Sequence, residues 1–154
     1  MKGEGSNAKL GLPDRVSIDS GVLLAYFLGE ELAGFVKGKI LQPQLRAVFF
    51  NHVAVAETFY ILCRRRGVTV AREVVETFLR TGYANLLSSD ELDIQAGSYK
   101  CDRNLSLADC YVLAAAKIHK AAALFAKKEK DVEQEMARQP FDVEILFLED
   151  FLNE

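Results

Sequence analysis

The sequence has few of the side chains from which most thiolate, imidazole and disulfide sites are built. Among its 154 residues are three cysteines and two histidines. Cys63, Cys101 and Cys110 form no C-x-x-C pair, which disfavours a structural zinc site and a disulfide framework. His52 and His119 lie far apart in the sequence, so a histidine-based catalytic or metal site is not indicated. The acidic residues are therefore the main candidates for chemistry.

The sequence also lacks a long apolar run and an excess of positive charge. A membrane span needs roughly 18–20 apolar residues, and the best candidate, residues 107–118, is interrupted by Asp109 and Lys117. Residues 1–15 contain no apolar segment of the kind found in signal peptides. The 19 Lys and Arg against 22 Asp and Glu give a net charge of −3, which disfavours coating of duplex DNA. We expect a soluble, cytoplasmic protein that contacts nucleic acid only through a local basic patch or bridging metal ions.

Half of the residues are hydrophobic, which excludes global disorder, and the length fits one domain. We expect residues 1–14 to form a flexible lead-in and residues 15–154 to form a single domain. Short apolar strands, expected at 16–18, 47–50, 84–88, 122–126 and 144–148, alternate with helices. The helices are expected at 21–31, 53–66, 69–81, 90–101, 106–120 and 129–138, with a short helix and a loop within 34–44.

Unalternating apolar strands separated by helices are typical of a parallel sheet that is covered on both faces. The expected fold class is therefore α/β, a three-layer α/β/α sandwich with a short parallel sheet. Ligands of such sheets bind outside the carboxyl ends of the strands. This directs attention to the residues that follow Ile18, Ser88, Ala126 and Leu148.

Two acids stand out in the first half of the chain. Asp19 directly follows the first expected strand, where it is either a helix N-cap or a metal ligand at the edge of the sheet. Glu57 is the only charged residue in the apolar stretch 53–63. A buried, unpaired carboxylate is costly, so Glu57 either faces a cleft or reaches the helix rim and pairs with Arg64 or Arg65. Both interpretations stay open for each acid.

Three further acids lie at expected helix starts. Ser106 and Asp109 have the S-x-x-D spacing of a capping box, but Asp109 also stands alone on an apolar helix that could face a cleft. Glu129 and Asp131 follow the strand at 122–126, within a charged run that is usually a solvated helix start. Together these acids indicate a site for a hard cation such as Mg²⁺ or Mn²⁺, which favours carboxylate oxygens and can activate water against a phosphodiester.

The order of these motifs resembles that of the PIN-domain family. The segment VSIDSGVLLAY at 16–26 resembles its opening strand with Asp-Thr/Ser and two leucines. The segment VAETFYIL at 55–62 resembles its second block, and LSLADCYVLA at 105–114 is similar to its third, LS-x-x-D-A-x-x-x-A. The resemblance covers about residues 15–148, and the size and spacing resemble the VapC-type toxins of toxin–antitoxin pairs.

The resemblance implies a Mg²⁺- or Mn²⁺-dependent endoribonuclease with Asp19, Glu57 and Asp109 as catalytic acids and metal ligands. Ser20 would order the site by hydrogen bonding. The fourth acid is either Glu129 or Asp131, because KKEKDV at 127–132 replaces the family's T-x-D-x-D-F. The resemblance further implies an RNA substrate, a homodimer and an antitoxin.

Four basic residues, Arg64, Arg65, Lys127 and Lys128, are candidates for binding RNA, although cations at helix ends are common. Because the fourth block departs from the family pattern, two other functions stay open. One is a degenerate PIN-like module that binds RNA or protein without cutting, and the other is a stand-alone PIN nuclease of RNA processing. A phosphoryl-accepting Asp in a receiver-like fold is less well supported, since the acid cluster and late lysine of such proteins are not evident.

Overall fold

The strands and helices alternate along the chain, as the sequence predicts. The computed structural model describes residues 12–41 and 45–152. The first half contains β1 (Arg15–Ile18), α1 (Ser20–Phe27), α2 (Ala33–Phe35), the π-helix η2 (Val36–Ile40), β2 (Ala47–Asn51), α3 (His52–Arg66) and α4 (Val68–Arg80). The second half contains β3 (Asn85–Leu87), α5 (Asp90–Asp102), α6 (Leu107–His119), β4 (Ala122–Phe125), α7 (Lys130–Arg138), β5 (Ile145–Phe147) and the 3-10 helix η3 (Leu148–Phe151).

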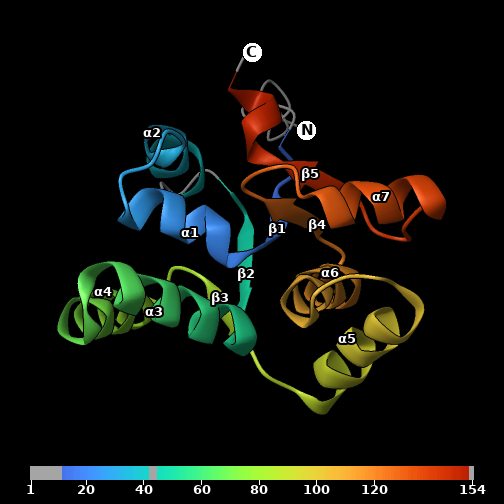
Figure 1. Cartoon of the computed structure of the whole chain (residues 1–154), viewed down its shortest axis with the longest axis horizontal. Helices are drawn as coiled ribbons and strands as arrows, with labels where there is room; N and C mark the ends of the chain where they lie inside the picture. Colours follow the sequence, from blue (N-terminus) through green and yellow to red (C-terminus); the bar gives the residue numbers. More distant parts are fainter. Residues whose placement is uncertain (1–11, 42–44, 153–154) are drawn as a thin grey trace.

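The five strands form one parallel sheet in the order β3-β2-β1-β4-β5. Helices α1, η2 and α3 pack on one face of the sheet, and α5, α6 and α7 pack on the other (Figure 1). The expected three-layer α/β/α sandwich is therefore confirmed.

Both faces of the sheet are buried, which explains why its strands read as continuous apolar runs. Along β1, Val16 and Ile18 enter the core under α1. Ser17 points to the opposite face, where its hydroxyl donates to the carbonyl of Val112 in α6 at 2.8 Å. Along β4, Leu124 joins the first core and Phe125 the second. Successive side chains thus fill two separate cores.

The strand order reverses direction at β1, which has β2 on one side and β4 on the other. In an open parallel sheet such a switch point leaves a crevice at the carboxyl ends of the two central strands. The residues that follow β1 and β4 therefore meet at this edge. Both segments carry acids, Asp19 after β1 and Glu129 after β4.

Helix α1 ends earlier than the sequence pattern predicts, at Phe27 rather than near residue 31. Gly29 adopts a left-handed φ of 65°. Its N–H donates to the carbonyl of Tyr26, and the N–H of Glu30 donates to that of Ala25. These two bonds form a Schellman motif, in which glycine at the left-handed position stops the helix.

Strand β3 is more exposed than expected. The sequence predicts a short buried strand, but Asn85 and Leu86 are solvent exposed and Leu87 is half-buried. β3 is the outer strand of the sheet beside β2. The apolar run alone does not reveal this, because it does not specify the strand order.

Most of the expected lead-in lies outside the described residues. Its described part begins at Leu12, which is 4% exposed and packs in the core under α1. Residues 42–44, in the expected loop before β2, also lie outside the described residues. Within residues 12–41 and 45–152, no helix has both the length and the apolar character needed to cross a bilayer.

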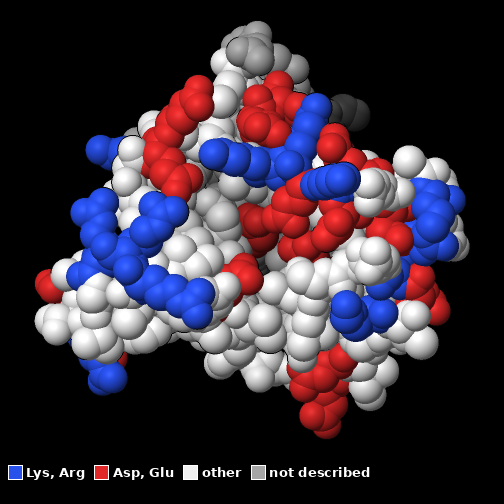
Figure 2. All heavy atoms as spheres, viewed as in Figure 1, with Lys and Arg blue, Asp and Glu red and all other residues white. Residues whose placement is uncertain are grey.

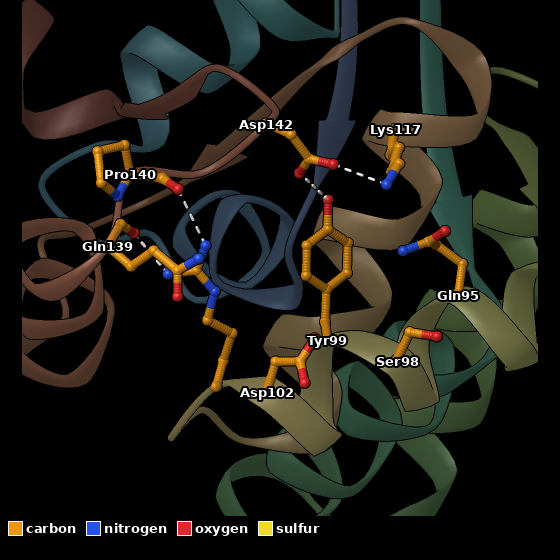
Figure 3. Close-up of a pocket in the computed structure, with 9 residues that line it drawn as sticks. Gln95, Ser98, Tyr99, Asp102, Lys117, Gln139, Pro140 and Asp142 are labelled. Atoms are coloured by element: carbon orange, nitrogen blue, oxygen red, sulfur yellow. Dashed lines mark hydrogen bonds and ion pairs between the residues drawn. The ribbon is translucent and has the colours of Figure 1, made fainter.

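A polar pocket of about 660 Å³ lies between α5, α6 and the segment that joins α7 to β5 (Figure 3). Asp142 bridges two groups there, since it accepts from the Tyr99 hydroxyl at 2.5 Å and pairs with the Lys117 ammonium at 2.7 Å. Arg103 donates to the carbonyls of Gln139 and Pro140. These contacts tie α5 and α6 to the segment between α7 and β5. Burial alone raises the pKa of Asp142, but the hydrogen bonds from Lys117 and Tyr99 lower it overall.

Removing the Tyr99 hydroxyl is expected to weaken this connection. Tyr99→Phe should lower the free energy of unfolding by about 1 kcal/mol, the usual net value of one hydrogen bond. Urea denaturation of the purified protein measures the change. Tyr111→Phe is the matched control, because Tyr111 makes a similar bond to Asp93 on the exposed surface. An equal loss in both variants would contradict a special role for the Tyr99 bond.

Candidate active site

Asp19 is fixed at the carboxyl end of β1 by backbone groups of β4, of α1 and of the segment that follows β4. Its N–H donates to the carbonyl of Leu124 at 3.1 Å, and its Oδ1 accepts from the N–H of Val22 at 3.1 Å. It also accepts a hydrogen bond from the backbone of Ala126. The residue is 7% exposed. Asp19 is thus an N-cap of α1 and, at the same time, an acid at the switch point of the sheet.

Ser20 and Glu57 connect α1 to α3 at the same edge. The Ser20 hydroxyl donates to Oε1 of Glu57. Glu57 is half-buried, and its observed partner is Ser20 rather than Arg64 or Arg65. The contact holds the Glu57 carboxylate beside the start of α1, close to Asp19.

Asp109 lies in the first turn of α6 and is 9% exposed. Its N–H donates to the hydroxyl of Ser106 at 3.1 Å, which is one half of the expected capping box. Its carboxyl group is hydrogen bonded to Glu129. The cap therefore fixes the backbone of Asp109, and its side chain reaches the segment after β4.

Glu129 occupies the N-cap position of α7, in the loop between β4 and α7. Its side chain is half-buried and contacts Asp109, not the end of its own helix. Asp131 lies in the first turn of α7, where its side chain is exposed. The structure thus brings Asp19, Glu57, Asp109 and Glu129 together and leaves Asp131 outside the group.

Burial and like charge strongly perturb two of these carboxyl groups. The pKa of Asp19 is raised to about 7, chiefly by burial and further by the charges of Asp109 and Glu57, against the lowering effect of the Val22 hydrogen bond. The pKa of Glu129 is raised to about 8 by burial, by its hydrogen bond to Asp109, and by the charges of Asp109, Asp19 and Glu57. The four acids therefore act as one electrostatic cluster in which full ionisation is unfavourable.

The donor set fits a divalent cation. All four side chains offer oxygen, the preferred ligand of Mg²⁺ and Mn²⁺. Two carboxyl groups can hydrogen bond only through a proton, so the Asp109–Glu129 contact marks a position that a cation could take instead. Within the described ranges, no three His, Cys, Asp or Glu side chains already converge as a finished coordination sphere.

A pocket of about 230 Å³ opens beside the acids. It is lined by Asp19, Gly21, Leu24, Leu28, Glu30, Ile61, Arg65, Ala126, Lys127 and Glu129. Figure 2 shows acidic side chains gathered in the middle of this face, near the start of α7, with basic side chains on both sides of them. The site therefore combines an acidic floor with cationic flanks.

The structure separates the four basic candidates. Arg65 and Lys127 line the pocket beside the acids. The guanidinium of Arg64 instead lies over the ring of Tyr60 at 4.9 Å, and Lys128 pairs with Asp150 at 3.1 Å. Only Arg65 and Lys127 of these four are thus seen at the pocket.

Comparison with known families decides the classification. The PIN-domain family model matches residues 16–134, which is most of the chain. The chain belongs to the PIN-domain family. The matched region contains all four clustered acids of this PIN domain. A comparison with curated proteins finds no match.

Solved structures with the same fold include toxin proteins. The PIN domain is similar to VapC20 of Mycobacterium tuberculosis, described as a sarcin-ricin loop cleaving toxin, with 17% identity over 84% of this chain and 98% of that chain and a TM-score of 0.63. It is similar to VapBC-1 of nontypeable Haemophilus influenzae, with 13% identity over 88% and 98% and a TM-score of 0.58. It is also similar to a toxin–antitoxin complex from Klebsiella pneumoniae, with 17% identity over 81% of this chain and 92% of that chain and a TM-score of 0.57. At these identities the likeness establishes the fold.

Sequence reasoning missed Gly21 and the pocket beside the acids. A Cβ at Gly21 would lie 3.1 Å from Oδ2 of Asp19 and 3.2 Å from the Cβ of Ala126. The absent side chain therefore leaves room for the Asp19 carboxylate and for Ala126, the residue after β4, to lie close to the backbone of α1. The DSG sequence directly after a strand was the available signal, since glycine near a strand end often marks a close approach.

Gly21→Ala is expected to disturb the candidate site more than the fold. The new methyl group must displace the Asp19 carboxylate by a few tenths of an ångström. If the acids act together in catalysis, a displacement of this kind should lower nuclease cleavage by about tenfold or more. The unfolding midpoint should change little, because the higher helix propensity of alanine offsets the cost of displacing the Asp19 carboxylate.

Gly97→Ala provides the matched control on α5, since nothing lies within 4 Å of the place that a Cβ would take there. It should raise the free energy of unfolding by about 0.5–1 kcal/mol and leave cleavage unchanged. Unchanged cleavage in Gly21→Ala would show that the close approach to Asp19 has no functional role.

Proposed function

We propose that this PIN domain is a Mg²⁺- or Mn²⁺-dependent endoribonuclease and the toxin of a toxin–antitoxin pair. The main observation behind the proposal is that four acids from separate parts of the chain meet at the switch point of the sheet. The fold shared with VapC20, a toxin described as cleaving the sarcin-ricin loop, supports an RNA substrate. Acidic floor and cationic flanks suit a reaction at a phosphodiester.

In this proposal Asp19 and Asp109 would hold the cation, and Glu57 and Glu129 would complete the site. A bound divalent cation would supply the positive charge that activates water and stabilises the leaving oxygen. Ser20 orients Glu57 through its hydroxyl. Arg65 and Lys127 bind RNA phosphates from the two sides of the pocket.

The departures in the fourth block do not remove the carboxylates. Glu129, in place of the family's first Asp, still reaches Asp109. Val132, in place of the family's Phe, is fully buried in the core between the sheet and α7. The presence of valine instead of phenylalanine at this position therefore affects the packing of the core and not the acid cluster. These observations favour a nuclease over a degenerate module.

The direct test is cleavage of a labelled single-stranded RNA by purified protein with Mg²⁺ or Mn²⁺ and with EDTA. Cleavage that needs the cation and stops in EDTA supports the proposal. Binding of RNA without cleavage under all these conditions supports the degenerate module instead. The metal ion that gives the higher rate identifies the preferred cofactor.

One structural neighbour is a toxin–antitoxin complex, which supports an antitoxin as a partner. We propose an antitoxin that inhibits cleavage, encoded beside this chain, and a homodimer of the PIN domain. Exposed apolar residues on α3 and α4, including Tyr60, Val68 and Val70, provide a dimer surface. Light scattering across the micromolar range tests the dimer. If cleavage is found but no neighbouring small protein inhibits it, a stand-alone nuclease is favoured.

A further inference from the structure

The pocket beside the acids extends along two helices that present matching residues. On α3, Glu57, Ile61 and Arg65 are spaced four residues apart and share one face. The face therefore changes from acid to apolar to base over about 12 Å of helix axis. Ile61 and Arg65 both line the pocket, whose acidic end holds Asp19 and Glu129.

Helix α1 and its C-cap residue Leu28 supply the opposite wall. Ser20, Leu24 and Leu28 are also spaced four residues apart, and Ser20 is the residue that binds Glu57 across the gap. Leu24 and Leu28 line the pocket together with Ile61. These three aliphatic side chains form the apolar part of the pocket, called the aliphatic channel below, and Asp19, Glu129 and Arg65 line the same pocket.

Glu30 lines the same pocket from the turn that follows α1. The Schellman motif at the end of α1 fixes its backbone through the bond to Ala25 at 2.9 Å. The Glu30 side chain lines the pocket and is half-buried. Across residues 12–41 and 45–152, its carboxylate makes no hydrogen bond or ion pair. An acceptor without a protein partner therefore stands at the side of an aliphatic channel.

We infer that this channel holds the base of a nucleotide next to the scissile phosphate of single-stranded RNA, and that Glu30 selects guanine. The inference rests on the proposed nuclease function. Unstacked RNA bases are typically stacked between aromatic or apolar side chains and are recognised by hydrogen bonds along their Watson–Crick edges. Leu24, Leu28 and Ile61 provide the apolar contacts, and Arg65 binds the phosphate of a neighbouring nucleotide.

The chemistry of the carboxylate determines the choice of base. An ionised carboxylate has two acceptor oxygens and no donor. Guanine offers two adjacent donors, the N1–H and the N2 amino group, which match both oxygens. Adenine and cytosine place one amino group beside a ring nitrogen acceptor, and uracil places its N3–H between two carbonyl oxygens. In each of these bases an acceptor atom would therefore lie against a carboxylate oxygen and be repelled by it. Glu30 therefore favours guanine over the other three bases.

The test uses short single-stranded RNAs that differ at one position, which holds guanine, inosine, adenine or uracil. Inosine lacks only the N2 amino group of guanine. Cleavage in Mn²⁺ should favour guanine over inosine by about tenfold, since a hydrogen bond to a charged group has at least this value. Glu30→Gln should reduce the ratio to below about threefold. The control Glu31→Gln, which changes the next residue and lies outside the pocket, should keep the wild-type ratio.

Equal cleavage of guanine and inosine substrates by the wild-type protein would overturn the inference and leave the nuclease function in place. A guanine preference that survives Glu30→Gln unchanged would also overturn it. A pocket that serves only a protein partner would give the first of these results.

If the wild-type protein cuts none of the RNAs, the proposed function fails, and binding decides the inference separately. Fluorescence anisotropy with the Asp109→Asn protein and the same RNAs measures RNA binding in the absence of cleavage. Tighter binding of guanine than inosine RNA, lost in the Asp109→Asn, Glu30→Gln double variant, supports the base pocket. Equal binding, or no binding, rejects it.

Discussion

Asp19→Asn is expected to abolish cation-dependent RNA cleavage, with a loss of about 10³-fold or more. The substitution removes one anionic oxygen from the floor of the site, where charge complementarity with the cation is required. The shape of the side chain and its role as N-cap of α1 are retained, because asparagine also caps helices. Initial rates on a labelled single-stranded RNA in Mn²⁺ measure the loss, and circular dichroism shows that the fold is intact.

Two other acids sharpen this prediction. Glu129→Gln should lower the rate by about 10²-fold or more, because its carboxyl group contacts Asp109. Asp131→Asn should stay within about twofold of the wild-type rate, because its side chain is exposed outside the cluster. The opposite order would make Asp131 the fourth acid. Full activity of both Asp19→Asn and Asp109→Asn would reject the proposed site.

The metal-free protein is expected to become less stable as the pH rises from 5 to 8. The pKa of Asp19 is about 7 and that of Glu129 about 8, both above their ordinary values near 4. The folded state therefore holds these protons more tightly than the unfolded chain does. The stability that these two groups contribute is fully present below about pH 4, falls as the pH rises through their folded-state pKa values and levels off only above about pH 9.

Asp19 alone should account for a loss of about 2 kcal/mol between pH 5 and pH 8, since a tenfold change in proton affinity corresponds to about 1.4 kcal/mol. Urea denaturation in EDTA at the two pH values measures it. Asp19→Asn, which carries no ionisable group there, should show a smaller pH dependence and a higher stability at pH 8. Adding Mn²⁺ should restore stability to the wild-type protein at pH 8. A pH dependence that is identical in Asp19→Asn would contradict the clustered charges.

The α/β class and the position of the acids could be predicted from local patterns. Asp19 follows a strand, and Asp109 follows a helix-capping serine, so short segments of sequence are enough to predict that both acids lie near helix starts. Glu57 is conspicuous as a lone charge on an apolar helix. These local patterns do not show that the acids lie close together in space. The strand order that brings residues 19, 57, 109 and 129 together arises from packing across the whole sheet.

The features that sequence reasoning missed depend on pairs of elements. The channel exists because the four-residue spacing on α1 meets the same spacing on α3, and neither spacing alone indicates a pocket. The partner of Glu57 could not be chosen in advance, since Ser20 is close only after α1 packs against α3. The choice between Glu129 and Asp131 likewise depends on where α7 begins, and a shift of one or two residues changes which acid faces Asp109.

The most direct test of the central claim is anomalous diffraction from crystals soaked with Mn²⁺. The four acids gathered at the switch point should bind the cation, so one strong anomalous peak is expected within ligand distance, about 2.0–2.6 Å, of oxygens from both Asp19 and Asp109. Glu57 and Glu129 should reach the same ion directly or through water. An absence of any peak near these acids at saturating Mn²⁺, or a peak held by other residues alone, would contradict the account.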